Sequence, residues 1–219
     1  PEGKAGWGFL RYEMLKEAID EHLQVWFDKI IRPVTQGTWT PGKALKKADM
    51  MLLDKKKGDV STLDNFRGIG LLQHSYKLIE WGLMATMWKQ LMAAMDDEVL
   101  GFLPSRSSCQ ALWRARAEID KRMRAGKPWV WLSMDVKKAF DTVVREVELA
   151  AAEGLGVSKE WLRGWENLWD GLEAQLRVGG SRGGKVTWNR GVVQGGQTSP
   201  GHYAIASLYF VRGIKKQFK

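Results

Sequence analysis

The chain has 219 residues, enough for one large domain or two small ones with a buried core. Its 34 Lys and Arg against 25 Asp and Glu give a formal net charge of +9, which favours a polyanionic partner such as nucleic acid. The single cysteine, Cys109, excludes an internal disulfide and a cysteine-rich zinc site. It favours a reducing, intracellular compartment without separating nucleus from cytoplasm. The longest apolar run, residues 204–211, is too short to span a bilayer, so no membrane partner is predicted.

The first part of the chain predicts mainly helices, from apolar residues at steps of three and four. In chain order the predictions are a helix over about 9–31 stopped by Arg32-Pro33, a linker over 34–42, a strand over 48–54, a basic turn over 55–59, and helices over about 72–91 and 108–124. The buried side of the last helix is predicted to carry Leu112, Ala115, Ile119 and Met123.

The second part predicts a strand, two helices, a hairpin and a final helix. In order these are a buried strand over 129–134, a helix over about 145–154, a helix capped by Ser158 with a tryptophan-rich stripe, a hairpin of 174–178 and 185–188 joined by a glycine turn over 179–184, and a final helix over about 200–216. Helices, hairpins and no regular strand–helix repeat favour an α+β fold.

Asp135 follows the apolar run Trp129-Val-Trp-Leu132, at the predicted end of the strand. A carboxylate at such a position holds a divalent cation in many phosphoryl-transfer sites, although an isolated one more often caps a turn. The surrounding pattern, Asp135-Val-Lys-Lys-Ala-Phe-Asp141, makes the catalytic interpretation more specific.

A second motif, Gln194-Gly-Gly-Gln-Thr-Ser-Pro200, combines a glycine turn with a helix start, in which Ser199 caps and Pro200 begins the helix. A third comprises Leu53-Asp-Lys-Lys-Lys-Gly-Asp59 and Asn65-Phe-Arg-Gly-Ile-Gly-Leu-Leu72. Each has a plain structural explanation by itself, as a well-formed helix start and a solvated hairpin tip.

In their order along the chain, which is 53–72, 135–141 and 194–200, the three motifs resemble the fingers and palm of reverse transcriptases, especially those of LINE-type (non-long-terminal-repeat) retrotransposons. The resemblance covers about 43–218 and implies a right-hand polymerase fold. It predicts an N-terminal helical extension over 1–36, fingers over 37–125 and a palm over 126–219 that lacks the second, Asp-Asp hairpin. The partners it implies are an RNA template, a DNA primer, deoxynucleoside triphosphates and the C-terminal palm and thumb of a longer parent chain.

The resemblance also implies roles for particular residues. Asp135 would be the catalytic carboxylate that binds Mg²⁺, with Mn²⁺ as the alternative, and Asp141 would start a helix. Phe140 would block a ribonucleotide 2′-hydroxyl. The implied nucleotide-binding residues are Lys55, Lys56, Arg67, Val136, Phe140, Gln194 and Gly195.

The stretch from Arg106 to Lys127 is strongly basic and predicts sequence-independent contacts with nucleic-acid phosphates. The candidates are Arg106, Arg114, Arg116, Arg122 and Arg124, and a merely solvated helix surface is the alternative for each.

Because two-metal catalysis needs more than one bridging carboxylate, we expect the piece to be inactive alone. The start at Pro1 also indicates a fragment. Two alternatives remain. One is a non-catalytic nucleic-acid-binding module with a degenerate palm. The other is a P-loop nucleotide hydrolase, suggested by Gly179-Gly-Ser-Arg-Gly-Gly-Lys185, although Val186 follows where Ser or Thr would hold Mg²⁺.

Overall fold

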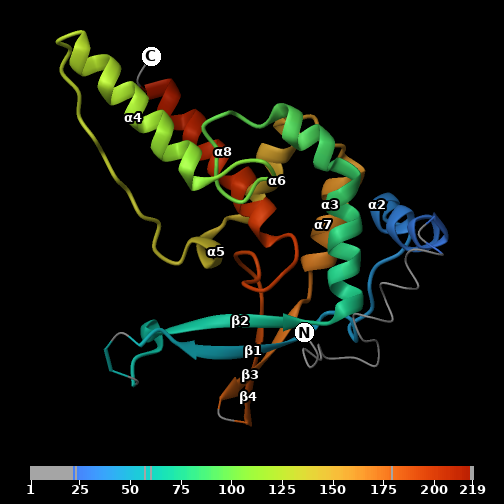
Figure 1. Ribbon diagram of the computed structural model, residues 1–219. Coiled ribbons are helices and arrows are strands. Elements are labelled where there is room, and N and C mark those ends of the chain that lie inside the picture. The colour runs from blue at the N-terminus through green and yellow to red at the C-terminus, as the bar shows by residue number, and fades with distance from the viewer. Residues whose placement is uncertain (1–21, 23, 57, 60, 179, 218–219) are drawn as a thin grey trace.

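The computed structural model describes residues 22, 24–56, 58–59, 61–178 and 180–217 (Figure 1). The fold is α+β, as predicted, with a four-stranded mixed sheet. The elements in order are η1 (Phe27–Ile31), α2 (Arg32–Gln36), β1 (Lys47–Asp54), η2 (Leu63–Asn65), β2 (Phe66–Leu72), α3 (His74–Ala94), α4 (Ser108–Arg124), α5 (Ala139–Thr142), α6 (Arg145–Gly154), α7 (Lys159–Trp169), β3 (Glu173–Val178), β4 (Ser181–Thr187) and α8 (Ser199–Gln217). No helix in these ranges is long and apolar enough to cross a bilayer.

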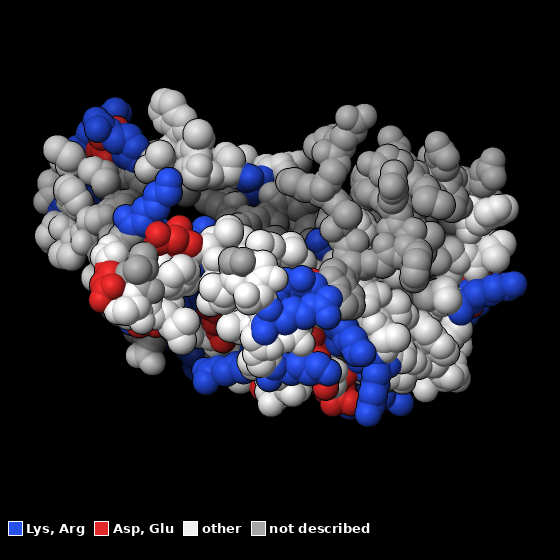
Figure 2. Space-filling view, turned by 90° about the horizontal axis from the view of Figure 1, so that it is seen from below, with Lys and Arg blue, Asp and Glu red and all other residues white. Residues whose placement is uncertain are grey.

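The sheet has the strand order β2-β1-β3-β4 and lies at the lower side of the molecule in Figure 1. β1 pairs antiparallel with β2, from Ala48 opposite Leu72 to Asp54 opposite Phe66. On its other edge β1 pairs parallel with β3. Strands from both predicted halves of the chain therefore share one sheet. Viewed from below, this side of the molecule carries Lys and Arg side chains gathered over its middle (Figure 2).

The β3–β4 hairpin forms as predicted, but its turn is shorter than expected. β4 already begins at Ser181, and Gly180 takes the left-handed conformation at φ 86°. A glycine tolerates this angle at no steric cost, which is why the chain can reverse there. Residues 181–185 of the P-loop-like run thus belong to strand β4, and the helix N-terminus that a P-loop needs does not follow them.

The core lies where helices α3, α6, α7 and α8 meet. Trp165 of α7 is completely buried there, and the hydroxyl of Tyr76 on α3 donates to the backbone oxygen of Leu168 at 3.0 Å. A buried polar pair joins α6 to α8, with His202 Nδ1 at 2.9 Å from Glu148 Oε1. The tryptophan stripe predicted for α7 is therefore core, and Ser158 caps the helix by accepting a hydrogen bond from the Trp161 amide.

The N-terminal helix prediction was wrong at its end. Its first part, residues 1–21 and residue 23, lies outside the described residues. The helix does not stop at Arg32-Pro33 but continues to Gln36, and Gly37 ends it at φ 71°. Pro33 is tolerated because it lies in the first turn of α2, where its fixed φ suits a helix and its missing N–H has no acceptor within α2.

Candidate functional site

The second half of the chain brings two of its sequence motifs into contact. The side-chain amide of Gln194 donates to both carboxylate oxygens of Asp141, at 3.1 and 3.2 Å. Next to this contact, the amide of Val192 donates to the backbone oxygen of Phe140 at 2.9 Å. The short helix α5, which contains both Phe140 and Asp141, is therefore held against the segment that leads into the glycine turn.

Two glycines permit the close approach of these backbones. Gly191 has φ 75°, and a Cβ there would lie 2.7 Å from the Phe140 oxygen. Gly195 has φ 108°, and its Cβ would lie 2.5 Å from the backbone oxygen of Gly70 on β2. The Gly70 amide in turn donates to the backbone oxygen of Gln194 at 2.6 Å. Any side chain at either position would separate segments that now touch.

Phe140, the predicted steric block, is half-buried in a cluster of three aromatic rings. Its ring stacks on Tyr203 of α8 with centroids 5.3 Å apart, and it meets Phe102 edge-on at 5.7 Å. The third pair, Phe102 and Tyr203, lies 5.9 Å apart. The direction of the Phe140 ring is thus fixed by two residues that the sequence analysis did not single out.

Lys55 and Arg67, two of the predicted phosphate ligands, lie together at the turn end of the β1–β2 hairpin. They line a pocket of about 310 Å³ with Leu53 and Asp54. The strand register explains this, because Leu53 is the pairing partner of Arg67. Lys56 has φ 53°, and its amide donates to the Asp54 carboxylate at 2.7 Å, so it forms part of the turn.

An ion-pair cluster ties this hairpin to the segment that contains Asp135. Lys138 Nζ lies 2.6 Å from Asp64 Oδ1, and Lys137 Nζ lies 3.6 Å from Asp64 Oδ2. The hydrogen bond from Lys138, with the charges of both lysines, lowers the pKa of Asp64. All three sequence motifs are therefore connected, although these exposed pairs add little stability.

The prediction of a buried strand over 129–134 was wrong. No residue from 127 to 136 is in a strand, and Val130 and Leu132 are 94% and 74% exposed. A strand needs a neighbour for its backbone hydrogen bonds and for its apolar face, and the four described strands pair only with one another. Asp135 and Val136 consequently lie in an exposed, extended segment and not at the end of a buried strand.

The described residues do not form a complete site for Mg²⁺. No group of three or more His, Cys, Asp or Glu residues within them is arranged to hold a metal ion. Asp135 is exposed and makes no hydrogen bond or ion pair with another described residue. Mg²⁺ requires near-octahedral oxygen coordination, to which one such carboxylate contributes at most a part.

Arg106, predicted to bind nucleic acid, instead donates hydrogen bonds to backbone oxygens of the chain itself. Its guanidinium donates to the backbone oxygens of Val99 at 2.8 Å and Met95 at 3.2 Å, and also to that of Asp96. The side chain is only 15% exposed. It satisfies carbonyl groups at the end of α3 and in the following loop, so it is poorly placed to contact phosphates.

Helix α4 has the predicted bounds, but its predicted buried face was wrong. Leu112 and Met123 are 68% and 63% exposed, Ala115 and Ile119 are half-buried, and no residue of α4 is fully buried. Figure 1 shows α4 standing away from the sheet beside α8. A helix with few neighbours cannot cover its apolar stripe, whatever the period of that stripe.

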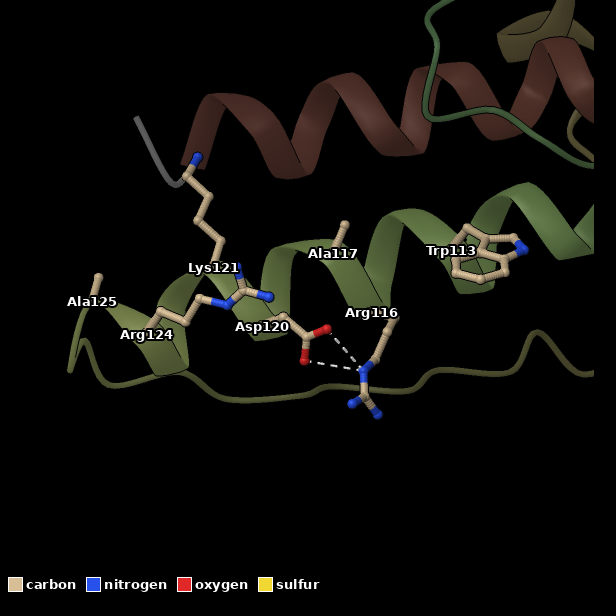
Figure 3. Close-up of a pocket in the computed structure, with 7 residues that line it drawn as sticks. All are labelled: Trp113, Arg116, Ala117, Asp120, Lys121, Arg124 and Ala125. Carbon is tan, nitrogen blue, oxygen red and sulfur yellow. Dashed lines mark hydrogen bonds and ion pairs between the residues drawn. The ribbon is translucent and has the colours of Figure 1, made fainter.

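One face of α4 carries a shallow pocket of about 650 Å³ (Figure 3). Its lining is formed by Trp113, Arg116, Ala117, Asp120, Lys121, Arg124 and Ala125. Arg116 forms an ion pair with Asp120 at 3.0 Å, and Arg122 pairs with Glu118 at 2.8 Å. The Arg114 guanidinium donates to the Asp97 backbone oxygen. Arg124 and Trp113 remain exposed at this face.

Sequence reasoning also missed Glu80 of α3. Its buried carboxyl group accepts a hydrogen bond from the backbone amide of Gln197 at 3.1 Å. A signal was present, because Glu80 lies between Ile79 and Leu83 on the predicted buried stripe. An acid in such a position must find a polar partner inside the protein.

Comparison with known proteins agrees with these motifs. Residues 53–219 match the family model described as reverse transcriptase (RNA-dependent DNA polymerase). The chain is also similar to the transposon TX1 uncharacterized 149 kDa protein of Xenopus laevis, with 23% identity over 172 residues. That alignment covers 78% of this chain and 13% of the relative, so the chain spans only a small part of the relative's length.

The family match contains all three motifs, from Leu53 in the basic hairpin to the Ser199-Pro200 helix start and beyond. It covers far more than half of the chain. The chain belongs to the reverse transcriptase (RNA-dependent DNA polymerase) family.

Proposed function

We propose that the chain is the fingers and part of the palm of a LINE-type reverse transcriptase with a right-hand polymerase fold. Fingers would occupy 37–125 and palm 126–219, with 1–36 as an N-terminal extension. In the parent protein, this part would bind an incoming deoxynucleoside triphosphate beside an RNA template and a DNA primer. The observation that carries the proposal is the convergence of Gln194, Asp141 and Gly70, which unites the separate motifs.

The proposed nucleotide contacts come from two groups of residues. Arg67 and Lys55, which share a pocket, would hold the triphosphate, since guanidinium and ammonium groups bind phosphate oxygens well. Lys56 and Val136 would lie at the edge of the same site. Gln194 and Gly195 would face the base pair being formed.

Phe140 would contact the sugar at the 2′ position and so favour deoxynucleotides. The support is its fixed ring direction beside the Gln194–Asp141 contact. A ring held by Tyr203 and Phe102 can exclude an additional hydroxyl by its position alone.

Asp135 would supply one metal ligand to this site when the remaining ligands are present. Since the described residues do not complete a metal site, we propose that they bind the nucleotide without adding it to a primer by themselves. The exposed apolar residues around 129–136 support a further palm segment of the parent as the partner that covers them.

A titration with a fluorescent deoxynucleoside triphosphate tests the nucleotide site. Arg67→Ala should weaken binding by about tenfold or more, because it removes a charged donor to phosphate. Lys185→Ala, at an exposed position of β4, is the matched control and should leave the affinity unchanged. Loss of binding in Lys185→Ala alone would favour the P-loop interpretation and contradict this one.

A second candidate function is binding of nucleic acid without catalysis, through α4. The favouring observation is the exposed face with Trp113, Arg116, Lys121 and Arg124, which combines a ring with cationic groups. Exposed aromatic rings and basic side chains suit unpaired bases and phosphates respectively. RNA binding by the chain in the absence of any nucleotide binding would make this candidate the better one.

A further inference from the structure

The side chain of Glu80 contacts the glycine turn of the candidate nucleotide site, residues 194–197. This side chain is on α3 and is 2% exposed. Oε2 accepts a hydrogen bond from the Gln197 amide at 3.1 Å, and Oε1 lies 3.4 Å from where a Cβ of Gly196 would be. The carboxyl group is thus pressed against the backbone of two consecutive residues of the turn.

At its other end, the same turn is held by hydrogen bonds of Gln194. The backbone oxygen of Gln194 accepts a hydrogen bond from the Gly70 amide, and the Gln194 side chain donates to Asp141. Between the ends, the Gly196 amide donates to the Val193 oxygen at 2.9 Å. Ser199 Oγ donates to the same oxygen at 2.7 Å. These hydrogen bonds connect the residues of the turn with one another, and the hydrogen bond to Glu80 connects the turn to α3.

We propose that Glu80 is a positioning residue for the nucleotide site, whose buried carboxyl fixes the Gln197 amide and thereby places Gln194 and Gly195 against β2. This inference rests on the proposed function for the nucleotide, but the positioning itself does not require it. No contact between Glu80 and the nucleotide is implied.

The chemistry of the position favours a positioning role over a simple packing role. An apolar side chain would pack at a buried site without cost, whereas a carboxyl must be desolvated and hydrogen-bonded. Burial raises the pKa of Glu80 to about 8, opposed by the Gln197 hydrogen bond and by Lys77. The group is therefore neutral near pH 7, and a neutral carboxyl still accepts the Gln197 hydrogen bond.

The test compares three variants of the whole chain. Glu80→Ala removes the acceptor, and Glu80→Gln keeps an acceptor oxygen in a side chain of the same size. Leu91→Ala is the matched control, because Leu91 is also buried on α3 and is 1% exposed. We would measure hydrogen exchange of the Gln197 and Gly70 amides, and then titrate each variant with a fluorescent deoxynucleoside triphosphate.

Glu80→Ala should speed exchange at Gln197 and Gly70 by about tenfold or more relative to Leu91→Ala, since a buried donor loses its acceptor. It should also weaken nucleotide binding, and Glu80→Gln should restore both properties. Equal exchange in Glu80→Ala and Leu91→Ala would overturn the proposal. If exchange responds while the unmodified chain binds no nucleotide, the positioning role stands and the proposed function fails.

Discussion

At the scale of single residues, the site depends on backbone atoms that approach closely enough to exclude a side chain. Gly191 and Gly195 provide these approaches, each at a positive φ. The glycines are visible in the sequence, and a turn around 194–197 follows from them. Their contacts with Phe140 and Gly70 do not, because those partners are distant in the chain and only the fold brings them near.

Gly191→Ala should destabilise the chain through this close approach. The Cβ would lie 2.7 Å from the Phe140 oxygen and 2.8 Å from Asp141 Cα, both backbone atoms that cannot turn away. Gly171→Ala is the control, since Gly171 has φ 65° but nothing within 4 Å of an added Cβ. Each variant pays about 1–2 kcal/mol for the positive φ, and Gly191→Ala should lose about 1–3 kcal/mol more from the clash. Urea denaturation gives both values, and equal losses would mean that the contact yields without cost.

Glu80 predicts a pH dependence of stability with a definite sign. Its pKa is about 8 in the folded chain against an ordinary value of 4.5, so the folded state holds the proton more tightly. The corresponding stability is fully present below pH 4.5 and is lost as the pH rises toward 8, by about 1.4 kcal/mol per unit over that window. The other groups around it are Lys77 and Tyr76 on α3, with Arg145 of α6 acting on Tyr76.

The difference in free energy of unfolding between the native chain and Glu80→Gln isolates this effect. Glutamine does not titrate, so the native chain should lose stability relative to the variant between pH 5 and 8. Denaturation curves at a series of pH values measure the difference. Parallel stability profiles would show that Glu80 is already ionised at neutral pH.

At the scale of elements, local signals predicted where helices begin and end but not what they contact. α4 begins after Ser107, whose hydroxyl and the side chain of Gln110 form a capping box, and it ends before Gly126 at φ 61°. Both signals lie within the helix and its flanks. Burial of Leu112 and Met123 depends on a second element that packs against α4, and the local sequence pattern does not predict whether such an element is present.

The strand predicted over 129–134 failed for the same reason. Leu132→Ala should change the free energy of unfolding by less than about 0.5 kcal/mol, because Leu132 is 74% exposed. The same substitution at Leu72, which is 1% exposed on β2, should cost about 3 kcal/mol. Chemical denaturation of the two variants makes the comparison. A large loss in Leu132→Ala would mean that the segment is buried in solution.

The basic helix α4 predicts binding that depends strongly on salt. Reversing Arg114, Arg116, Arg122 and Arg124 to Glu should abolish retention of the chain on RNA at low salt, since several phosphate contacts and their counterion release disappear. Reversing Lys43, Lys89, Lys159 and Arg163, which are all exposed and lie outside α4, changes the net charge equally and serves as the control. Equal losses in both variants would show that net charge alone binds RNA. Arg106 is left intact because it holds the end of α3.

At the scale of the whole molecule, the α+β class followed from the order of elements, but the sheet did not. The parallel pairing of β1 with β3 joins residues from the predicted fingers to residues from the predicted palm. Lys46 adds to this junction, because its ammonium donates to the backbone oxygens of Asn167 at 2.6 Å and Asp170 at 2.8 Å. Such pairings are non-local, and hydrophobic periodicity specifies a strand without specifying its neighbour.

This connectivity predicts that the two halves of the chain stay together when the link between them is cut. The segment 127–134 is extended and exposed, which makes it a preferred site for limited digestion by chymotrypsin after Trp129 or Trp131. The halves should remain associated, since they share the β1–β3 ladder and hydrogen bonds from Tyr76 to Leu168 and from Trp161 to Leu83. Size-exclusion chromatography of the nicked chain should therefore give one peak, and mass spectrometry under denaturing conditions should give two fragments. Separate elution of the fragments under native conditions would instead mean that the two halves are independent units, which the shared sheet does not hold together. The proposed nucleotide site would then have to assemble on binding.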